Sequence, residues 1–240
     1  MKFEDLKKLH QKKFREELRF FLVEGEHLVQ ELQKAATRDA RLRGSEIYLT
    51  RDYAHWSGAL PRHVINSKQM AQISETRSPQ GIAAVVPLIT ATAPRANERA
   101  IYLHEIQDPG NLGTILRTLA WFGNFRCLLS PDSVDVHNGK VVRASMGAIF
   151  HVPVEIDVPL AALPARCKRI ACLDLAGEPV ASREFRDFDC YVFGNEARGL
   201  PSGVAAELKA RPFTIAGSGA IESLNVAATV NISLYEINRP

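Results

Sequence analysis

The chain has 240 residues, of which 46% are hydrophobic and 24% are charged, and its formal net charge at pH 7 is +3. These values are ordinary for a globular protein with one large domain or two smaller ones. No apolar run approaches the roughly 20 residues that span a bilayer, and the first residues lack the apolar core of a signal peptide. We therefore expect neither a membrane span nor a secretory leader.

The four cysteines show neither a CxxC pair nor the spacing of metal ligands. They are Cys127, Cys167, Cys172 and Cys190. We expect them to be reduced, buried and structural, in a cytoplasmic protein. The seven histidines are scattered without ligand spacing, so the sequence predicts no metal site.

The charge is divided unevenly along the chain. Residues 1–95 carry 16 basic and 11 acidic side chains, a net charge of +5, whereas the remainder has a net charge of −2. A basic N-terminal part favours a polyanion docking there. A solvated helix face would give the same charge, so charge alone leaves both interpretations open.

The first 86 residues alternate short helices and short strands, which predicts a small α/β domain over residues 1–90. We expect helices at residues 1–20, 27–36 and 68–74, and strands at residues 20–23, 47–49, 64–65 and 81–86. Residues 87–100 lack periodicity and are rich in Ala, Thr and Pro, which indicates a linker that we place at residues 91–100.

A second α/β domain is predicted over residues 101–240, and its apolar strands indicate a parallel sheet that is buried on both faces. We expect strands at residues 101–106, 125–129, 170–173, 191–193 and 213–215, and helices at residues 112–122, 140–148 and 223–237. The last helix is apolar on more than one side, which is typical of a helix in a core or an oligomer interface.

The first candidate site is the segment from Asp108 to Arg117. A turn at residues 108–111 precedes the helix, and Asn111 is predicted to be its N-cap. Arg117 lies almost two turns further on, beside the packed face, where its guanidinium suits a phosphate or carboxylate. A capping Asn with an ordinary surface Arg is the alternative.

The second candidate site is the loop at residues 193–199, which follows a buried strand. Ligands of open α/β sheets bind at such strand ends. Gly194 allows a close backbone approach and Glu196 supplies a carboxylate. A plain turn with a solvated Glu is the alternative.

The third candidate site is the segment at residues 215–226, where a strand end meets small turn residues and a polar helix start. Ser223 and Asn225 can cap the helix or face a ligand. The Gly217-x-Gly219 step fails as a dinucleotide fingerprint because the next required position is Glu222, which disfavours a nucleotide-dependent oxidoreductase.

Taken together, these three motifs resemble the signature of the SpoU (TrmH-like) RNA ribose 2'-O-methyltransferases of the SPOUT superfamily. The resemblance covers residues 101–238 and includes the small-residue step at 145–148. The N-terminal part is similar to the ribosomal-protein-like RNA-binding domain often fused to this family, at Phe14, residues 23–25 and residues 79–82. One departure is Ala216-Gly217, where the family commonly has Pro-Met, which puts the adenosine pocket in doubt.

The resemblance implies an RNA substrate-binding domain followed by a trefoil-knotted parallel-sheet methyltransferase domain, a homodimer, and S-adenosylmethionine as cofactor without a metal. The implied cofactor contacts are Leu173, Phe193, Gly194, Ile215, Gly217, Leu224 and Asn225. The implied catalytic set is Arg117, Asn111, Glu196, Ser223 and Asn225.

The implied reaction is an in-line displacement from a sulfonium, in which the protein mainly aligns the reacting atoms. A guanidinium stays protonated, so we expect Arg117 to orient the ribose and stabilise the alkoxide while the proton passes to phosphate or water. Structured ribosomal RNA is favoured as substrate over transfer RNA. A transfer-RNA enzyme and a non-catalytic RNA-binding protein are the alternatives.

Overall fold

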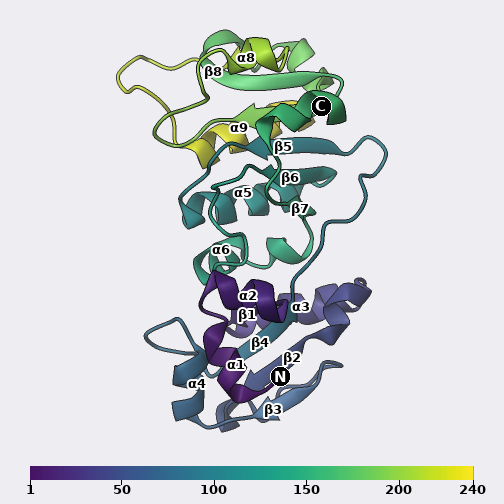
Figure 1. The fold of residues 1–240 in the computed structure, drawn as a ribbon, viewed down its shortest axis with the longest axis vertical. Coiled ribbons are helices and arrows are strands. Elements are labelled where there is room, and N and C mark those ends of the chain that lie inside the picture. The colour runs from purple at the N-terminus through teal and green to yellow at the C-terminus, as the bar shows by residue number, and fades with distance from the viewer. Residues whose placement is uncertain (240) are drawn as a thin grey trace. The chain divides into compact units, whose positions relative to one another are not determined.

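A computed structural model describes residues 1–239, and Pro240 lies outside the described residues. The chain folds into two compact units (Figure 1). Unit 1 comprises Met1–Ile89 and Asp135–His151, and unit 2 comprises Thr90–Val134 and the chain from Val152 onward. Each unit is built on one sheet. In these residues no helix is both long and apolar enough to cross a membrane.

Unit 1 contains a four-stranded sheet in the order β1-β4-β2-β3. The strands are β1 (Phe20–Glu24), β2 (Glu46–Leu49), β3 (Arg62–Val64) and β4 (Ile82–Pro87). The central strand β4 runs antiparallel to β1 and β2, while β2 and β3 are parallel. The helices are α1 (Phe3–Lys8), α2 (Lys12–Leu18), α3 (Glu26–Ala36), α4 (Ser67–Ile73) and α6 (Gly139–Ser145).

Both faces of this sheet are covered, because its inner strands β4 and β2 are buried along nearly their whole length. On one face, Leu6 and Leu9 from the α1 region and Met70 and Ile73 from α4 pack with strand residues in one hydrophobic cluster. Helices α3 and α6 both contact β1. This arrangement confirms a small α/β domain at the N-terminus.

The helical segment predicted over residues 1–20 is confirmed, and it consists of two helices, α1 and α2. The Leu9 carbonyl accepts a hydrogen bond of 2.7 Å from Arg15 Nη1, and α2 ends at Arg19 in the left-handed conformation (φ 64°). Arg15 is only 4% exposed and pairs with Asp135 at 2.5 Å. One of the basic residues that indicated a docking surface is therefore part of the core.

Unit 2 contains a six-stranded sheet in the order β10-β8-β9-β5-β6-β7, with every neighbouring pair parallel. The strands are β5 (Arg99–Leu103), β6 (Phe125–Leu129), β7 (Val154–Glu155), β8 (Ile170–Pro179), β9 (Cys190–Phe193) and β10 (Arg211–Thr214). The helices are α5 (Pro109–Phe122), α7 (Leu163–Arg166), α8 (Val204–Glu207) and α9 (Val226–Asn238). The predicted parallel α/β class is confirmed.

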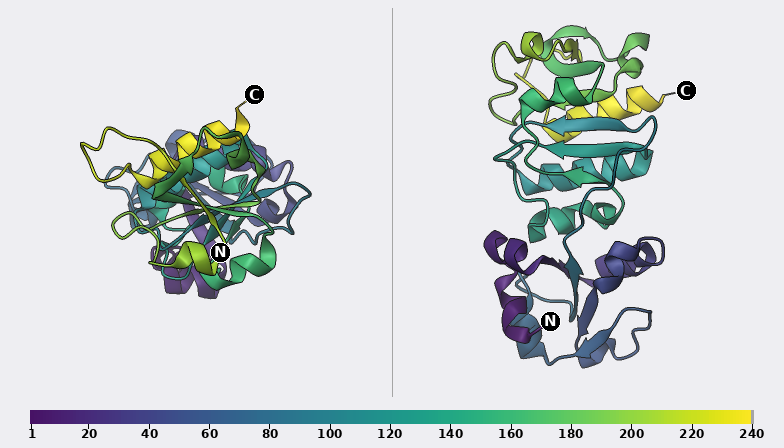
Figure 2. Two further views of the ribbon diagram at one scale, coloured as in Figure 1. Left: turned by 90° about the horizontal axis from the view of Figure 1, so that it is seen from above. Right: turned by 45° about the vertical axis from the view of Figure 1, so that its right-hand side comes forward.

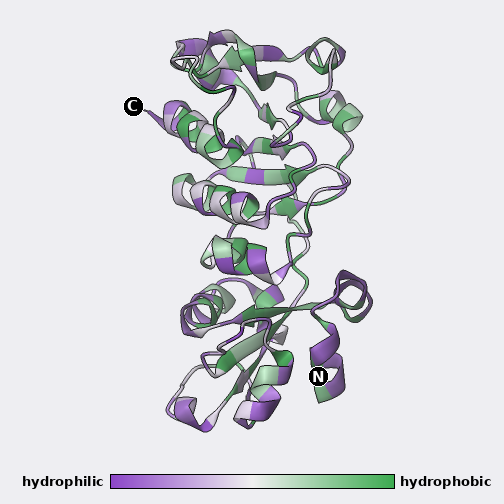
Figure 3. Cartoon of the chain, turned by 90° about the vertical axis from the view of Figure 1, so that its left-hand side faces the viewer, coloured by the Kyte–Doolittle hydropathy of each residue, from purple (hydrophilic) through white to green (hydrophobic). Residues whose placement is uncertain are grey.

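Helices cover both faces of this sheet, as the strands' continuous apolar character requires. Leu163 of α7 and Val204 of α8 join one cluster with Tyr102, Leu128 and Val192. Helices α5 and α9 pack against each other (Figure 2). Hydrophobic residues run along the buried strands (Figure 3).

Several element bounds differ from the prediction. Helix α5 begins at Pro109 and not at residue 112, and α9 begins at Val226 and not at residue 223. Strand β8 leaves its partner β10 after Cys172 and rejoins it at Glu178, so residues 173–177 protrude from the ladder.

Five short 3-10 helices complete the described chain, and they were not predicted, nor were the short elements α7, α8 and β7. They are η1 (Ala40–Gly44), η2 (Arg51–Tyr53), η3 (Ala148–Phe150), η4 (Leu160–Ala162) and η5 (Arg183–Asp187). All four cysteines are free, but Cys167 is only half-buried, so the expectation of four buried thiols is wrong at that position.

Candidate functional site

Glu196 joins two of the three candidate motifs in unit 2. Its carboxylate accepts hydrogen bonds from the backbone nitrogens of Gln107 (3.1 Å) and Asp108 (3.0 Å). It also accepts one from Asn111 Nδ2 at 3.2 Å. With these donors around it, the carboxylate holds the loop after β5 against the loop after β9.

Asn111 joins the third motif to the other two. Its Oδ1 accepts a hydrogen bond of 2.9 Å from Asn225 Nδ2, in the segment after β10. The Oδ1 of Asn225 in turn accepts from the backbone nitrogens of Ala227 (2.9 Å) and Ala228 (3.3 Å) at the start of α9. One polar network, Glu196–Asn111–Asn225, therefore connects the loops that follow β5, β9 and β10.

The N-cap prediction for Asn111 is wrong, and the reason explains the network. Asp108 caps α5 by accepting a hydrogen bond of 2.8 Å from Asn111 N, and Pro109 occupies the first turn, where its missing N–H costs nothing. The Asn111 side chain is thereby free to reach both neighbouring loops. The Asp-Pro pair was the sequence signal that could have identified the cap.

The loop after β9 is held rigid from inside by Asn195, which the sequence analysis missed. Asn195 is 8% exposed, and its Nδ2 donates to the Glu105 carbonyl at 2.7 Å. Its Oδ1 accepts from Ala197 N and Arg198 N. No local pattern marks this residue, because its main partner lies 90 positions earlier in the chain.

Gly194 is required by the loop itself. A Cβ built at this position would lie 2.3 Å from the Gly199 carbonyl carbon and 2.6 Å from Leu200 N. Any side chain would therefore push the loop open. The close backbone approach expected at Gly194 exists, and the approaching group is the other arm of the same loop.

Arg117 lies on the exposed side of α5, outside the Glu196–Asn111–Asn225 network. Its side chain makes no hydrogen bond or ion pair with any other residue between 1 and 239. An unpaired guanidinium on a rigid helix has its planar set of donors available for a phosphate or carboxylate.

The residues expected at the cofactor lie in, or in the segments that follow, three neighbouring strands, β10, β8 and β9. Leu173 and Ile215 are half-buried, Leu224 is 44% exposed, and the space beside Gly217 is open. Phe193 differs, because its side chain is 1% exposed and its carbonyl accepts from His104 N, so only its backbone is near the loop. Ser223 is exposed and makes no hydrogen bond with the described residues.

One cysteine, Cys172, directly precedes a residue expected at the cofactor, and it is buried. Burial raises the pKa of Cys172, which directly precedes Leu173, to about 11, so this thiol is protonated at neutral pH. No group of three or more His, Cys, Asp or Glu among residues 1–239 could hold a metal ion. The arrangement instead combines amide and carboxylate side chains, exposed apolar residues and one unpaired cation.

Comparison with known proteins gives two family matches that divide the chain. The SpoU rRNA Methylase family matches residues 98–235, and the MRM3-like substrate binding domain matches residues 2–84. A 23S rRNA (guanosine(2553)-2'-O)-methyltransferase of Bacillus subtilis, RlmP, is 28% identical over 98% of this chain and 95% of its own.

Solved structures are similar over nearly the whole chain. A putative TrmH-family RNA methyltransferase from Porphyromonas gingivalis is 30% identical with a TM-score of 0.84, covering 99% of this chain and 96% of that one. An AdoMet-bound rRNA methyltransferase from Sinorhizobium meliloti is 26% identical with a TM-score of 0.81, covering 99% and 94%. All three motifs lie within the matched region.

Proposed function

Because this chain belongs to the SpoU rRNA methylase family, we propose that it transfers the methyl group of S-adenosylmethionine to a ribose 2'-hydroxyl of ribosomal RNA. The observation that carries the proposal is the Glu196–Asn111–Asn225 network, because it unites the three motifs of the signature in one place. A fold shared with methyltransferases would be a weaker argument than these side chains.

Ribosomal RNA is the favoured substrate class. The Bacillus subtilis relative, which this chain matches over almost its full length, is named for 23S rRNA. Residues 2–84 match a substrate binding domain, and residues 1–95 have a net charge of +5. We propose that residues 1–90 form the RNA-binding domain and residues 101–240 the domain that catalyses methyl transfer. Residues 91–100 are the linker between these two domains.

The methyl donor fits residues that lie in β8, at the end of β9 and in the segment after β10. Half-buried Leu173 and Ile215 and exposed Leu224 offer apolar contacts for an adenosine, and the open space beside Gly217 admits a ligand to its backbone. The backbone of Phe193 and Gly194 lines the end of β9. S-adenosylmethionine supplies an activated methyl group on a sulfonium sulfur.

The chain's own groups then have to place and polarise the ribose. In the reaction, the 2'-oxygen forms a bond to the methyl carbon as the carbon–sulfur bond breaks, and the hydroxyl proton leaves to a phosphate or water. Arg117 stays protonated, so it acts by orienting the substrate and stabilising negative charge on the 2'-oxygen. Asn111, Glu196 and Asn225 hold the loops in register, and exposed Ser223 is free to contact the ribose.

We further propose a homodimer that uses α5 and α9. Trp121 on α5 is 85% exposed, and Ile232 and Tyr235 on α9 are 38% and 59% exposed. Large apolar side chains exposed on two adjacent helices mark an interaction surface. The trefoil knot that the family resemblance implies remains a prediction.

The test is transfer of a labelled methyl group from S-adenosylmethionine to total cellular RNA by wild type, Arg117→Ala, Arg117→Lys and Arg183→Ala. The side chain of Arg183 is also exposed and makes no hydrogen bond or ion pair among residues 1–239, so it is the matched control. We expect alkali-resistant 2'-label in ribosomal RNA, about 100-fold less of it with Arg117→Ala, and wild-type label with Arg183→Ala.

Two outcomes would contradict this assignment. Near-normal turnover by Arg117→Lys would show that the planar guanidinium is not needed. Wild-type protein that neither transfers the label nor binds S-adenosylmethionine would point to a non-catalytic RNA-binding protein.

A further inference from the structure

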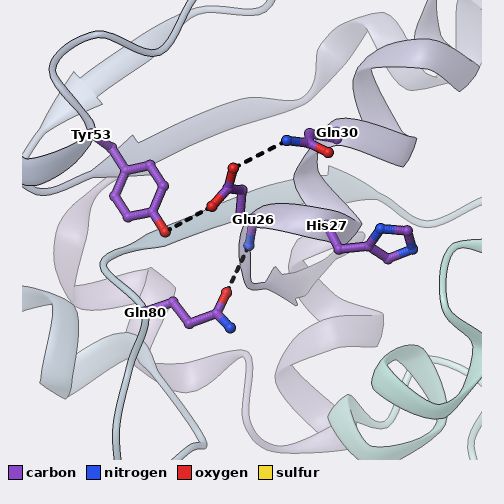
Figure 4. A pocket seen from close by; sticks show the side chains of 5 residues that line it. All are labelled: Glu26, His27, Gln30, Tyr53 and Gln80. Atoms are coloured by element: carbon purple, nitrogen blue, oxygen red, sulfur yellow. Dashed lines mark hydrogen bonds between the residues drawn. The ribbon is translucent and has the colours of Figure 1, made fainter.

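Unit 1 has a polar pocket that takes no part in the site described above. It is open to solvent, has a volume of about 490 Å³, and is shown in Figure 4. Five residues line it: Glu26, His27, Gln30, Tyr53 and Gln80. The pocket lies next to two segments, residues 23–25 and residues 79–82. At these two segments the N-terminal part resembles an RNA-binding domain.

Two glycines shape the walls of this pocket. Gly25 has φ +97°, and a Cβ there would lie 3.0 Å from Gln80 Oε1. Gly81 has φ +93°, and a Cβ there would lie 2.7 Å from Thr50 Oγ1 and 3.5 Å from the Tyr53 ring. These positive φ angles favour glycine, so both glycines allow the chain segments to approach closely.

One hydrogen bond fixes the orientation of the Gln80 amide. Gln80 Oε1 accepts from the Glu26 backbone nitrogen at 2.9 Å, at the start of α3. Its Nε2 is therefore the end of the amide that remains available as a donor to a ligand. Figure 4 shows this amide next to the Glu26 backbone.

The Glu26 carboxylate is held between two donors and keeps accepting capacity. Its Oε2 accepts from the Tyr53 hydroxyl at 3.3 Å, and its Oε1 accepts from Gln30 Nε2 at 3.1 Å. Each carboxylate oxygen has two lone pairs, so each can accept one more hydrogen bond. The exposed pocket thus presents two adjacent acceptors.

We propose that this pocket binds an unpaired guanine base of the RNA. The Watson–Crick edge of guanine carries two adjacent donors, N1–H and the 2-amino group, which match the two Glu26 oxygens. Adenine, cytosine and uracil each place at least one acceptor where guanine has a donor.

Charge and stacking favour the same ligand. A carboxylate repels phosphate groups, so its presence in a basic unit favours contact with a base edge over contact with the RNA backbone. The half-buried Tyr53 ring offers an aromatic surface of the kind on which unpaired bases stack. That the ligand is RNA rests on the proposed function, whereas the base identity follows from the donor and acceptor pattern.

The experiment measures fluorescence anisotropy of the full chain with labelled nine-nucleotide RNAs of uridine. Guanosine, inosine, adenosine or uridine occupies the central position. We expect guanosine to bind about tenfold more tightly than adenosine, with inosine between them because it lacks the 2-amino group. Glu26→Gln replaces one acceptor by a donor, so we expect the affinities for guanosine and adenosine to become equal.

Glu17→Gln is the matched control, since Glu17 is an exposed residue on α2 that does not line the pocket. It makes the same change of charge and should keep the guanosine preference. Equal binding of all four RNAs by wild type, no binding of any, or a guanosine preference that survives Glu26→Gln would overturn the proposal. The binding measurement needs no methyl donor, so the base preference can be interpreted even if the methyl-transfer assay fails.

Discussion

Asn225 performs two tasks with the two ends of one side chain. Its Oδ1 caps α9, and its Nδ2 reaches Asn111 across 114 positions of sequence. The first task stabilises a helix, while the second aligns the motif after β10 with the motif after β5. Substitutions that separate the two atoms can therefore separate stability from activity.

Asn225→Ser should retain the helix cap and lose the amide donor, whereas Asn225→Ala should lose both. An N-cap is worth about 1 kcal/mol, so we expect urea unfolding to show that loss for the Ala variant and less than about 0.5 kcal/mol for the Ser variant. Methyl transfer should fall about tenfold or more in both, since both lose the link to Asn111. Full activity in Asn225→Ser would show that the link is not needed.

At the scale of elements, the segment Asp135–His151 belongs to a different unit from the residues that precede and follow it in the sequence. It lies between β6 and β7 of the unit 2 sheet in sequence, yet it packs in unit 1. Asp135 pairs with Arg15, and the His137 ring lies 4.7 Å from the Phe21 ring. Breaking such a buried pair leaves an uncompensated charge, so this segment is held strongly.

The packing of this segment should depend on pH through His137. Burial lowers the pKa of His137 from its usual value near 6.5 to about 4, with Arg15 and Arg19 acting in the same direction and Asp135 opposing. The folded state then binds fewer protons than the unfolded state in this range. Its stability is complete above pH 6.5 and falls as the pH drops toward 4.

We expect wild type to lose on the order of 1–2 kcal/mol more than His137→Gln between pH 7 and pH 4.5, measured by urea unfolding. The difference between variants is the readout, because carboxylates titrate in all of them. His151→Gln, an exposed residue of the same segment, should keep the wild-type dependence. Identical curves for wild type and His137→Gln would contradict the prediction.

At the scale of the whole molecule, the proposed dimer determines which subunit's substrate the unpaired Arg117 side chain contacts. It lies on α5, four residues before Trp121, and neighbours at that spacing share a helix face. An arginine at the edge of a dimer surface can serve the substrate of the partner subunit. The exposed face of α5 would then have both an assembly role and a catalytic role.

Trp121→Glu should place a charge in this surface and convert the dimer to a monomer, as measured by light scattering during size-exclusion chromatography. Methyl transfer should be lost in parallel, because Arg117 would no longer face its substrate. Val64→Glu is the control, since Val64 is also an exposed apolar residue (65%) but lies on β3 of unit 1. A monomeric wild type would refute the dimer, and a monomeric but active variant would refute the shared site.

The sequence by itself determined the parallel α/β class and the three motifs. Apolar strand runs and helical spacing are local, so they survive in a single sequence. Local signals also located the strand ends where the motifs lie. They were less successful at helix starts, since Asp108 and Asn111 are both good caps and only the folded chain shows which one is used.

Only the tertiary structure decided which polar groups meet. The bond from Asn111 to Glu196 spans 85 positions, and the bond from Asn225 to Asn111 spans 114, so no local pattern specifies either. No local pattern specifies the pairing of Arg15 with Asp135 either, because the two residues are 120 positions apart. The contact between Glu26 and Gln80 in the pocket also joins residues that are distant in the sequence. Local spacing fixes where a helix or strand forms, whereas hydrogen bonds between distant loops depend on how the sheets bring those loops together.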